Sequence, residues 1–344
     1  MTTTRTRPPV LKRGTRTQVN ARRHTREAWR VGVETVVLSG ALCALGVWLS
    51  RQGGSPWVTG LAVGLAVMQG LMLQRMYIVG HEVAHRKLIP GHLGWNDAVG
   101  QGLTLPTLIP VAVYRCVHDF HHGFNRKDEH TSALDVFVTR GEITPLKRAY
   151  FHTLWLLGVF AGGFYLHSVA SVVVFLCLPT RLALRLSPAF RKWGARERRR
   201  AWGQFLACVA FHVGFAAVFG TWAWVLALGF PMLVFAWVWS LLMYMFHFHT
   251  SIGPQARFNT RSVRRDPFWS WLLLDFHEHA THHMYPNIPW YALQERRAEL
   301  PPAYQAVNER LPFWRAVWQQ WRGPTILRRD GPNPVPHLFV RWED

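Results

Sequence analysis

Histidines at helical spacing are the residues of this sequence best suited to chemistry. His279, His282 and His283 form an HxxHH box, and positions i, i+3 and i+4 of a helix lie on one face. Three imidazoles from one short segment can therefore converge on a point. His277 lies roughly 200° round the helix from His279, at about 100° per residue, and is the least suited of the four to the same ion. The segment predicts a metal site that needs partners elsewhere in the chain.

Two further histidine clusters supply such partners. His81 and His85 lie four residues apart, so both point the same way from one helix. With Glu82 they also form HExxH, the motif of zinc peptidases, in which two histidines bind zinc and the glutamate acts as base. A second HxxHH box consists of His118, His121 and His122. The HExxH match leaves a zinc peptidase open as an alternative.

The number of clustered histidines bears on the metal. Eight imidazoles in three clusters exceed the roughly four ligands that one zinc ion takes. They suggest two metal ions, each with a position left open, and imidazole suits iron. Zinc has no redox chemistry, so a two-iron site implies oxygen activation. A non-catalytic metal-binding membrane protein is a further alternative.

Composition places these clusters in a membrane protein. Of the 344 residues, 49% are hydrophobic, and the formal net charge is +20. The arginine clusters abut apolar blocks, which favours the cytoplasmic flanks of membrane spans over a nucleic-acid interface. The four cysteines are scattered without a CxxC pair, so we expect no disulfide framework.

Four apolar blocks are about as long as a membrane crossing requires. We expect spans over residues 31–50, 56–79, 204–230 and 232–246. Gly229 and Pro231 should form the outer turn of the second hairpin. Residues 151–179 are too short to cross twice, and one crossing would put the third box on the wrong side, so we expect a re-entrant or surface-lying segment. A basic amphipathic helix over 181–200 should follow it.

The prediction is an all-α integral membrane fold: four transmembrane helices in two hairpins, with a cytoplasmic helical cap that holds the metal site. We expect a disordered basic cytoplasmic tail over residues 1–30, a membrane domain over 31–300 and a C-terminal cytoplasmic cap over 301–344. Trp290 and Tyr291 should anchor the membrane surface after the third box.

The three boxes in this order resemble those of the membrane fatty acid desaturase and hydroxylase superfamily. The likeness covers roughly residues 31–300, and the continuation MYPNIPWYAL after the third box is similar to that of the family. The resemblance implies that the boxes bind two irons on the cytoplasmic face and that a histidine at the end of the fourth span completes the set. His247 fits that place better than His249. The implied metal ligands are His81, His85, His118, His121, His122, His247, His279, His282 and His283.

The resemblance implies an O2-dependent oxidoreductase that acts on fatty acyl chains, with desaturation to a C=C bond as the expected reaction. Hydroxylation, alkene-forming decarboxylation and carotenoid oxidation by a ketolase or hydroxylase remain alternatives at the same site. Asp119, Glu278 and Asp135 are candidates to orient ligand imidazoles. Neither an HPGG haem motif nor a cysteine set for an iron–sulfur cluster occurs, so we expect a separate electron donor of the ferredoxin, rubredoxin or cytochrome b5 type, with its reductase.

Overall fold

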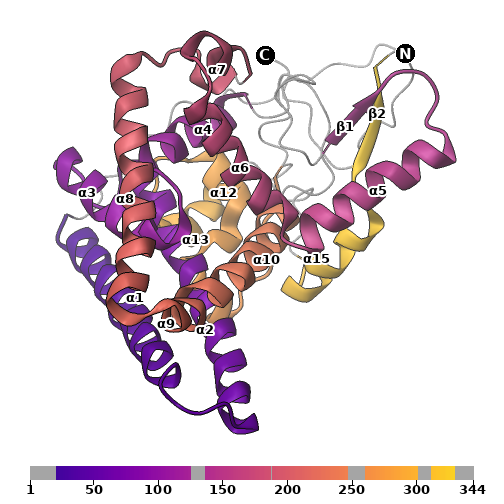
Figure 1. Cartoon of the computed structure of the whole chain (residues 1–344). Coiled ribbons are helices and arrows are strands. Elements are labelled where there is room, and N and C mark those ends of the chain that lie inside the picture. Colours follow the sequence, from indigo (N-terminus) through magenta and orange to yellow (C-terminus); the bar gives the residue numbers. More distant parts are fainter. Residues whose placement is uncertain (1–20, 125–135, 187, 247–259, 301–310, 330–344) are drawn as a thin grey trace, which may run out of the picture.

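Helices make up most of the computed structural model, which describes residues 21–124, 136–186, 188–246, 260–300 and 311–329. Figure 1 shows the hairpin of the first two helices in indigo, with the two short strands on the opposite side of the view. The α-helices are α1 (Ala21–Leu49), α2 (Pro56–Ala84), α3 (Leu93–Thr104), α4 (Val111–Phe124), α5 (Pro145–Phe160), α6 (Gly163–Cys177), α7 (Thr180–Leu186), α8 (Ala195–Phe219), α9 (Thr221–Trp224), α10 (Phe230–Met245), α11 (Pro267–Leu272), α12 (His279–Met284), α13 (Leu293–Arg296) and α15 (Phe313–Gln319).

Shorter helical turns link several of these helices. The 3-10 helices are η1 (Leu105–Thr107), η2 (Pro188–Phe190), η5 (Phe276–Glu278), η6 (Trp290–Ala292), η7 (Arg297–Glu299) and η8 (Gln320–Arg322), and a π-helical segment covers Val225–Gly229. One parallel strand pair, β1 (Val136–Thr139) with β2 (Thr325–Arg328), joins distant parts of the chain. The sequence did not predict it, because four-residue strands carry little periodicity.

Four helical stretches of the described chain are long and apolar enough to cross a membrane. They are Ala21–Leu49, Pro56–Ala84, Ala195–Phe219 and Thr221–Met245. The shortest has 25 residues, which at about 1.5 Å per residue exceeds the roughly 30 Å hydrocarbon core. Their apolar windows are 22%, 39%, 11% and 56% buried inside the molecule, so the first three are mostly open to lipid and the fourth lies partly in the protein interior. The expected all-α integral membrane fold is confirmed.

The first helix starts earlier than the sequence indicated. It begins at Ala21, so the last ten residues of the expected tail are helical. Contacts of His24 explain why this stretch is helical. Its Nδ1 lies 3.0 Å from the Tyr291 hydroxyl, and its Nε2 lies 3.4 Å from the Leu88 carbonyl oxygen. Trp290 is 3% exposed and packs its ring against His24. The expectation that Trp290 anchors a membrane surface is therefore wrong, because this ring is buried in protein.

The outer turn of the second hairpin lies at Gly220, so its prediction at Gly229 and Pro231 is wrong. Gly220 has φ +94°, a conformation that favours glycine, and it separates α8 from α9. Gly229 and Pro231 lie inside the fourth span instead. Proline has no N–H for the helical ladder, and the widened π-helical turn just before it accommodates this gap.

Helices α5 and α6 form a bent pair. They meet at 86°, and Gly162 at the bend has φ +74° and lies close to the backbone of Ala236. The helices have 16 and 15 residues, about 24 Å and 22 Å, so each is short of a full crossing. A bent pair of this kind is either one broken span or a re-entrant segment such as the one expected.

The basic stretch that follows is not one helix, contrary to the prediction for residues 181–200. Helix α7 ends at Leu186, Pro188 opens the turn η2, and α8 begins only at Ala195. The last arginines of the stretch belong to the first turns of α8. Proline and the N-cap Gly194 interrupt the helix at positions where charge patterning alone gives no warning.

Close contact between spans gives a first testable prediction. A Cβ on Gly46 would lie 2.8 Å from the Ala227 backbone, whereas a Cβ on Gly40 in the same helix would meet nothing within 4 Å. Gly46→Leu should therefore destabilise the protein by about 1–3 kcal/mol through overpacking. Gly40→Leu, the matched control, should be neutral or slightly stabilising. Thermal unfolding in detergent measures both, and equal melting temperatures would contradict this contact.

Candidate metal centre

The histidine boxes lie near the ends of two neighbouring spans, α2 and α10. Helix α10 packs along α2, and Gly70 permits this approach, because a Cβ there would lie 2.6 Å from the Val234 side chain. The last turn of α2 carries the first box, and α4, which carries the second, packs against α2. The third box lies in α12 and ends before Pro286, as the sequence predicted.

The eight box histidines form two groups. Within each group, one ring nitrogen per residue lies within 4.8 Å of all the others. The five-histidine group is His81, His85, His118, His122 and His282, and the three-histidine group is His121, His279 and His283. All eight are buried or half-buried. The boxes that were singled out by spacing are therefore adjacent in space.

Each HxxHH box divides between the two groups, so the expectation that its three imidazoles converge on one point is wrong. In the second box His118 and His122 join one group and His121 the other. In the third box His279 and His283 belong together, and His282 joins the five-histidine group. Residues four apart differ by about 40° round a helix and neighbours by about 100°, so the i, i+4 pair stays together and the third imidazole turns away.

The spacing of the nitrogens fits cation ligands. The Nε2 atom of His122 lies 3.1 Å from that of His118 and 3.0 Å from that of His282. The Nε2 atoms of His118 and His85 are 2.8 Å apart, and those of His121 and His283 are 3.2 Å apart. At a metal–nitrogen distance of about 2.1 Å, ligands at 90° lie about 3.0 Å apart and tetrahedral ligands about 3.4 Å apart. The groups can therefore hold metal ions.

Burial keeps the imidazoles ready to act as ligands. It lowers the pKa well below the ordinary 6.5, and repulsion between neighbouring rings lowers it further, for His85, His118, His122 and His282. These rings are neutral at pH 7, and a neutral ring has a lone pair to donate.

Glu82 orients a histidine of the first box. Its Oε1 lies 3.1 Å from Nδ1 of His81, so the carboxylate can accept the Nδ1 proton and leave Nε2 as the donor atom toward the cluster. Lys87 lies 4.0 Å from the same carboxylate and donates to the Ile288 carbonyl oxygen at 2.8 Å. From the sequence, Glu82 was predicted only as the base of a peptidase; its place directly beside His81 was the available signal for this second role.

The three acidic residues predicted to orient ligand imidazoles lie in different surroundings. Glu278 is buried, but it accepts hydrogen bonds from Thr281 and Arg297, both at 3.0 Å. Asp119 is exposed on α4. Asp135 lies outside the described residues.

A strained turn precedes the third box. Leu274 and Asp275 have φ values of +49° and +54°, which cost of order 1 kcal/mol or more for residues with a side chain. His277 then donates no ring to either group; its Nδ1 lies 3.3 Å from the Ser270 hydroxyl. This agrees with its expected exclusion. The alternatives for the ninth ligand, His247 and His249, lie outside the described residues.

Arg115, which the sequence analysis missed, fixes the first two boxes relative to each other. It lies one turn before His118, and its guanidinium donates to the carbonyl oxygens of Ala84 and Val83, both at 3.1 Å. Both carbonyls lie in the last turn of α2, where the regular helical ladder ends. The Val83 carbonyl oxygen also accepts from the Arg86 N–H at 2.9 Å and from Asn96 at 3.1 Å. Arg115 also binds Asp97 of α3 through both Nη atoms.

Asp97 has a second cationic partner, Arg200 of α8. Burial of Asp97 disfavours its charge, but hydrogen bonds from Arg115 and Arg200 outweigh burial and lower its pKa from 3.8 to about 2. The carboxylate therefore stays charged at physiological pH and holds both arginines.

Fold and site together define a multi-pass membrane protein with a buried histidine cluster able to bind metal. A sequence profile described as fatty acid desaturase matches residues 55–315, which is most of the chain. The chain belongs to the fatty acid desaturase family.

Characterised relatives carry out more than one reaction. The chain is similar to the acyl-lipid (9+3)-(E)-desaturase of Dimorphotheca sinuata, with 24% identity over 77% of this chain and 73% of the relative. It is 27% identical to a ceramide hydroxylase of Caulobacter vibrioides, over 72% of this chain and 74% of the relative. It is 24% identical to the sn-1 acyl-lipid omega-3 desaturase (ferredoxin) of a Nostoc species, over 73% and 71%. These relatives place the chain among oxidoreductases that act on lipids.

The arginine contacts give a second prediction. Arg115→Gln should lower the metal content and the melting temperature, because it removes the guanidinium donor to the Ala84 carbonyl oxygen and one of the donors to that of Val83. Arg200→Gln is the matched control: it also loses a bond to Asp97 but touches no box helix end. The loss expected for Arg115→Gln is about 1.5–3 kcal/mol of stability. Equal metal content in both variants would show that Arg115 does not position the boxes.

Proposed function

We propose that the chain is an O2-dependent di-iron oxidoreductase that acts on fatty acyl chains and introduces a C=C bond. The observation that carries this proposal is the gathering of eight box histidines, in two groups, at adjoining ends of α2 and α10 in a member of the desaturase family. Imidazole ligands suit iron. The position at the ends of spans suits a substrate that comes from the membrane.

Each histidine group would hold one iron. The five histidines of one group would hold one ion, and the three histidines of the other would hold the second together with a further protein ligand. We assign that ligand to His247, because the preceding Phe246 has its ring 5.1 Å from that of His279. Two bound irons would supply the oxidising power to remove hydrogen from an unactivated C–H bond.

The protein's own residues hold and shield this chemistry. Glu82 fixes the tautomer of His81, and Arg115 holds the first box against the second. His282 and His279, each 1% exposed, are shielded from bulk water, whereas His85, His121 and His122 of the same groups are half-buried. The active site would lie on the cytoplasmic face, with residues 301–344 as part of its cap.

Hydroxylation of a lipid is the second candidate, and the similarity to a ceramide hydroxylase favours it. Desaturation and hydroxylation both begin with removal of hydrogen at a carbon held beside the metals. Desaturation takes a second hydrogen from the neighbouring carbon, whereas hydroxylation adds oxygen. The identities of 22–27% to the relatives are compatible with both.

A separate protein would deliver the electrons. The Nostoc relative is named as a ferredoxin enzyme, and a net charge of +20 suits an acidic carrier of the ferredoxin, rubredoxin or cytochrome b5 type.

The arrangement of the first box argues against a zinc peptidase. Such an enzyme needs a zinc held by His81 and His85 and a water activated by Glu82. Here Glu82 is turned to Nδ1 of His81 and toward Lys87, and three imidazoles from the other boxes join the same group.

Metal analysis gives a third prediction. The purified wild-type protein should contain about two irons per chain, and His247→Ala should retain about one. His249→Ala is the matched control and should keep both. The double variant His282→Ala, His283→Ala removes a ligand from each group and should lose both irons. A single zinc that persists in this double variant would refute the di-iron proposal.

Product analysis gives a fourth prediction and decides the reaction. The protein, reconstituted in bilayers with ferredoxin, its reductase, NADPH and O2, should convert acyl lipids into products two mass units lighter. A gain of sixteen mass units would mean hydroxylation instead. The double variant that lacks iron should give neither product, and activity in that variant would contradict the assigned site.

A further inference from the structure

An exposed apolar stripe runs along α5. Leu146, Tyr150, Leu154 and Leu157 recur every three or four residues, and they are 80%, 58%, 36% and 56% exposed. The opposite face is buried, with Trp155 at 0% exposure. The helix therefore has a second apolar face with no cover among the described residues, and such a stripe marks a contact surface.

The segment 313–322, made of α15 and η8, extends this surface. Trp314, Trp318 and Trp321 are 66%, 72% and 47% exposed. Trp155 of α5 donates through Nε1 to the Gln320 carbonyl oxygen at 2.7 Å. The rings of Phe160 and Trp321 stack at 4.2 Å. The two elements are thus one surface.

Buried contacts hold the segment in place. Arg261 donates to the Met245 carbonyl oxygen at the end of α10, to the Ala316 carbonyl oxygen at 3.1 Å and to Gln319 at 2.7 Å. The segment is therefore held firmly in place while its tryptophan side chains remain exposed.

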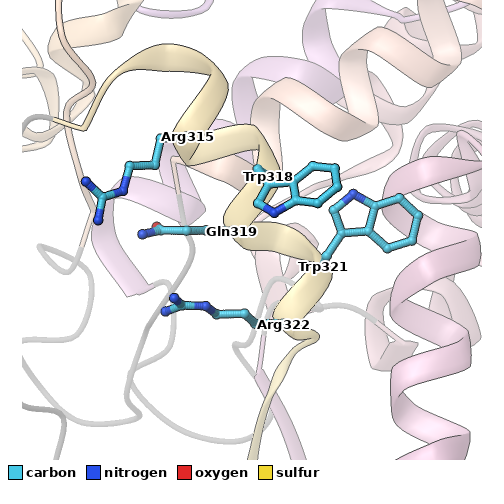
Figure 2. A pocket seen from close by; sticks show the side chains of 5 residues that line it. All are labelled: Arg315, Trp318, Gln319, Trp321 and Arg322. Carbon is cyan, nitrogen blue, oxygen red and sulfur yellow. The ribbon is translucent and has the colours of Figure 1, made fainter.

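The charged side chains of this surface are all cationic. Figure 2 shows Arg315, Gln319 and Arg322 extending to one side of the helix, while Trp318 and Trp321 extend to the other. Together α5 and the segment 313–322 contain four cations, Lys147, Arg148, Arg315 and Arg322, and no acidic residue. Tryptophan beside arginine is the pairing that suits a membrane interface, where the ring lies at headgroup depth and the guanidinium meets phosphate.

We propose that α5 and the segment 313–322 form a lipid-docking surface, separate from the four spans, that seats in an anionic leaflet. The α5–α6 pair packs on α10 yet is bent by 86°, so α5 is next to a span without the length to cross. Its stripe faces lipid along the membrane surface, and Arg315 of α15 and Arg322 of η8 bind lipid phosphates. Through Arg261 the docked segment fixes the end of α10, which leads to the metal centre.

Site-specific photo-crosslinking tests this surface in the full-length protein. A benzophenone amino acid is placed at Trp318 or at Leu154, and the protein is reconstituted in phosphatidylcholine vesicles with phosphatidylserine. Both positions should form lipid adducts as readily as Val63, which is 61% exposed on the span α2. Glu295, an exposed acid of α13, should form few. Intact mass identifies the adducts, and size-exclusion chromatography confirms folding.

Two results would overturn the proposal. One is a yield of lipid adducts at Trp318 and Leu154 no higher than at Glu295. The other is crosslinking of these positions to a second copy of the chain, which would make the surface a protein interface.

The role of the arginines has its own test. Arg315→Gln with Arg322→Gln should lower the lipid adduct yield at Trp318 about threefold or more in vesicles with phosphatidylserine, and little in phosphatidylcholine alone. An equal effect in both vesicles would refute recognition of anionic lipid.

Discussion

The convergence of eight imidazoles at the ends of membrane spans is the constraint on which the rest of the structure depends. Placing so many polar rings together out of water is costly unless their nitrogens have partners. The rings must also be neutral, because several positive charges within 5 Å would repel strongly. Burial keeps the rings neutral by lowering the pKa of His85 and its neighbours. A bound cation would give the ring nitrogens their partners, so folding and metal binding are linked.

Arginines hold the segments that carry the histidines. Arg115 binds carbonyls in the last turn of α2, Arg261 joins the end of α10 to α15, and Arg297 binds Glu278 directly before the third box. A guanidinium presents five donors in a rigid plane, so one side chain can satisfy carbonyls from two segments at once. Irregular backbone near a membrane needs such side-chain donors, because its carbonyl oxygens have little access to water.

The features that show a periodic pattern in the sequence were predicted, whereas those that depend on tertiary contacts were missed. The boxes and spans follow from spacing and hydropathy, and both are confirmed as helices. The turn at Gly220 was missed because Gly229 and Pro231 gave a stronger local signal. The helical start over residues 21–30 depends on the contact of His24 with Tyr291, which no neighbour in sequence reveals. The division of each HxxHH box follows from the turn of about 100° per residue, but which group each imidazole joins depends on where α2, α4 and α12 lie.

The parallel pairing of β1 with β2 has a consequence for biosynthesis. Val136 pairs with Thr325, so a strand made before the second hairpin waits for one made after that hairpin and the third box. The third box likewise reaches the first two only after the last span has been inserted. Membrane insertion and completion of the histidine cluster are thus separated in time, and the partly made chain holds imidazoles without their partners. A metal ion can enter the complete cluster only after the third box has been synthesised.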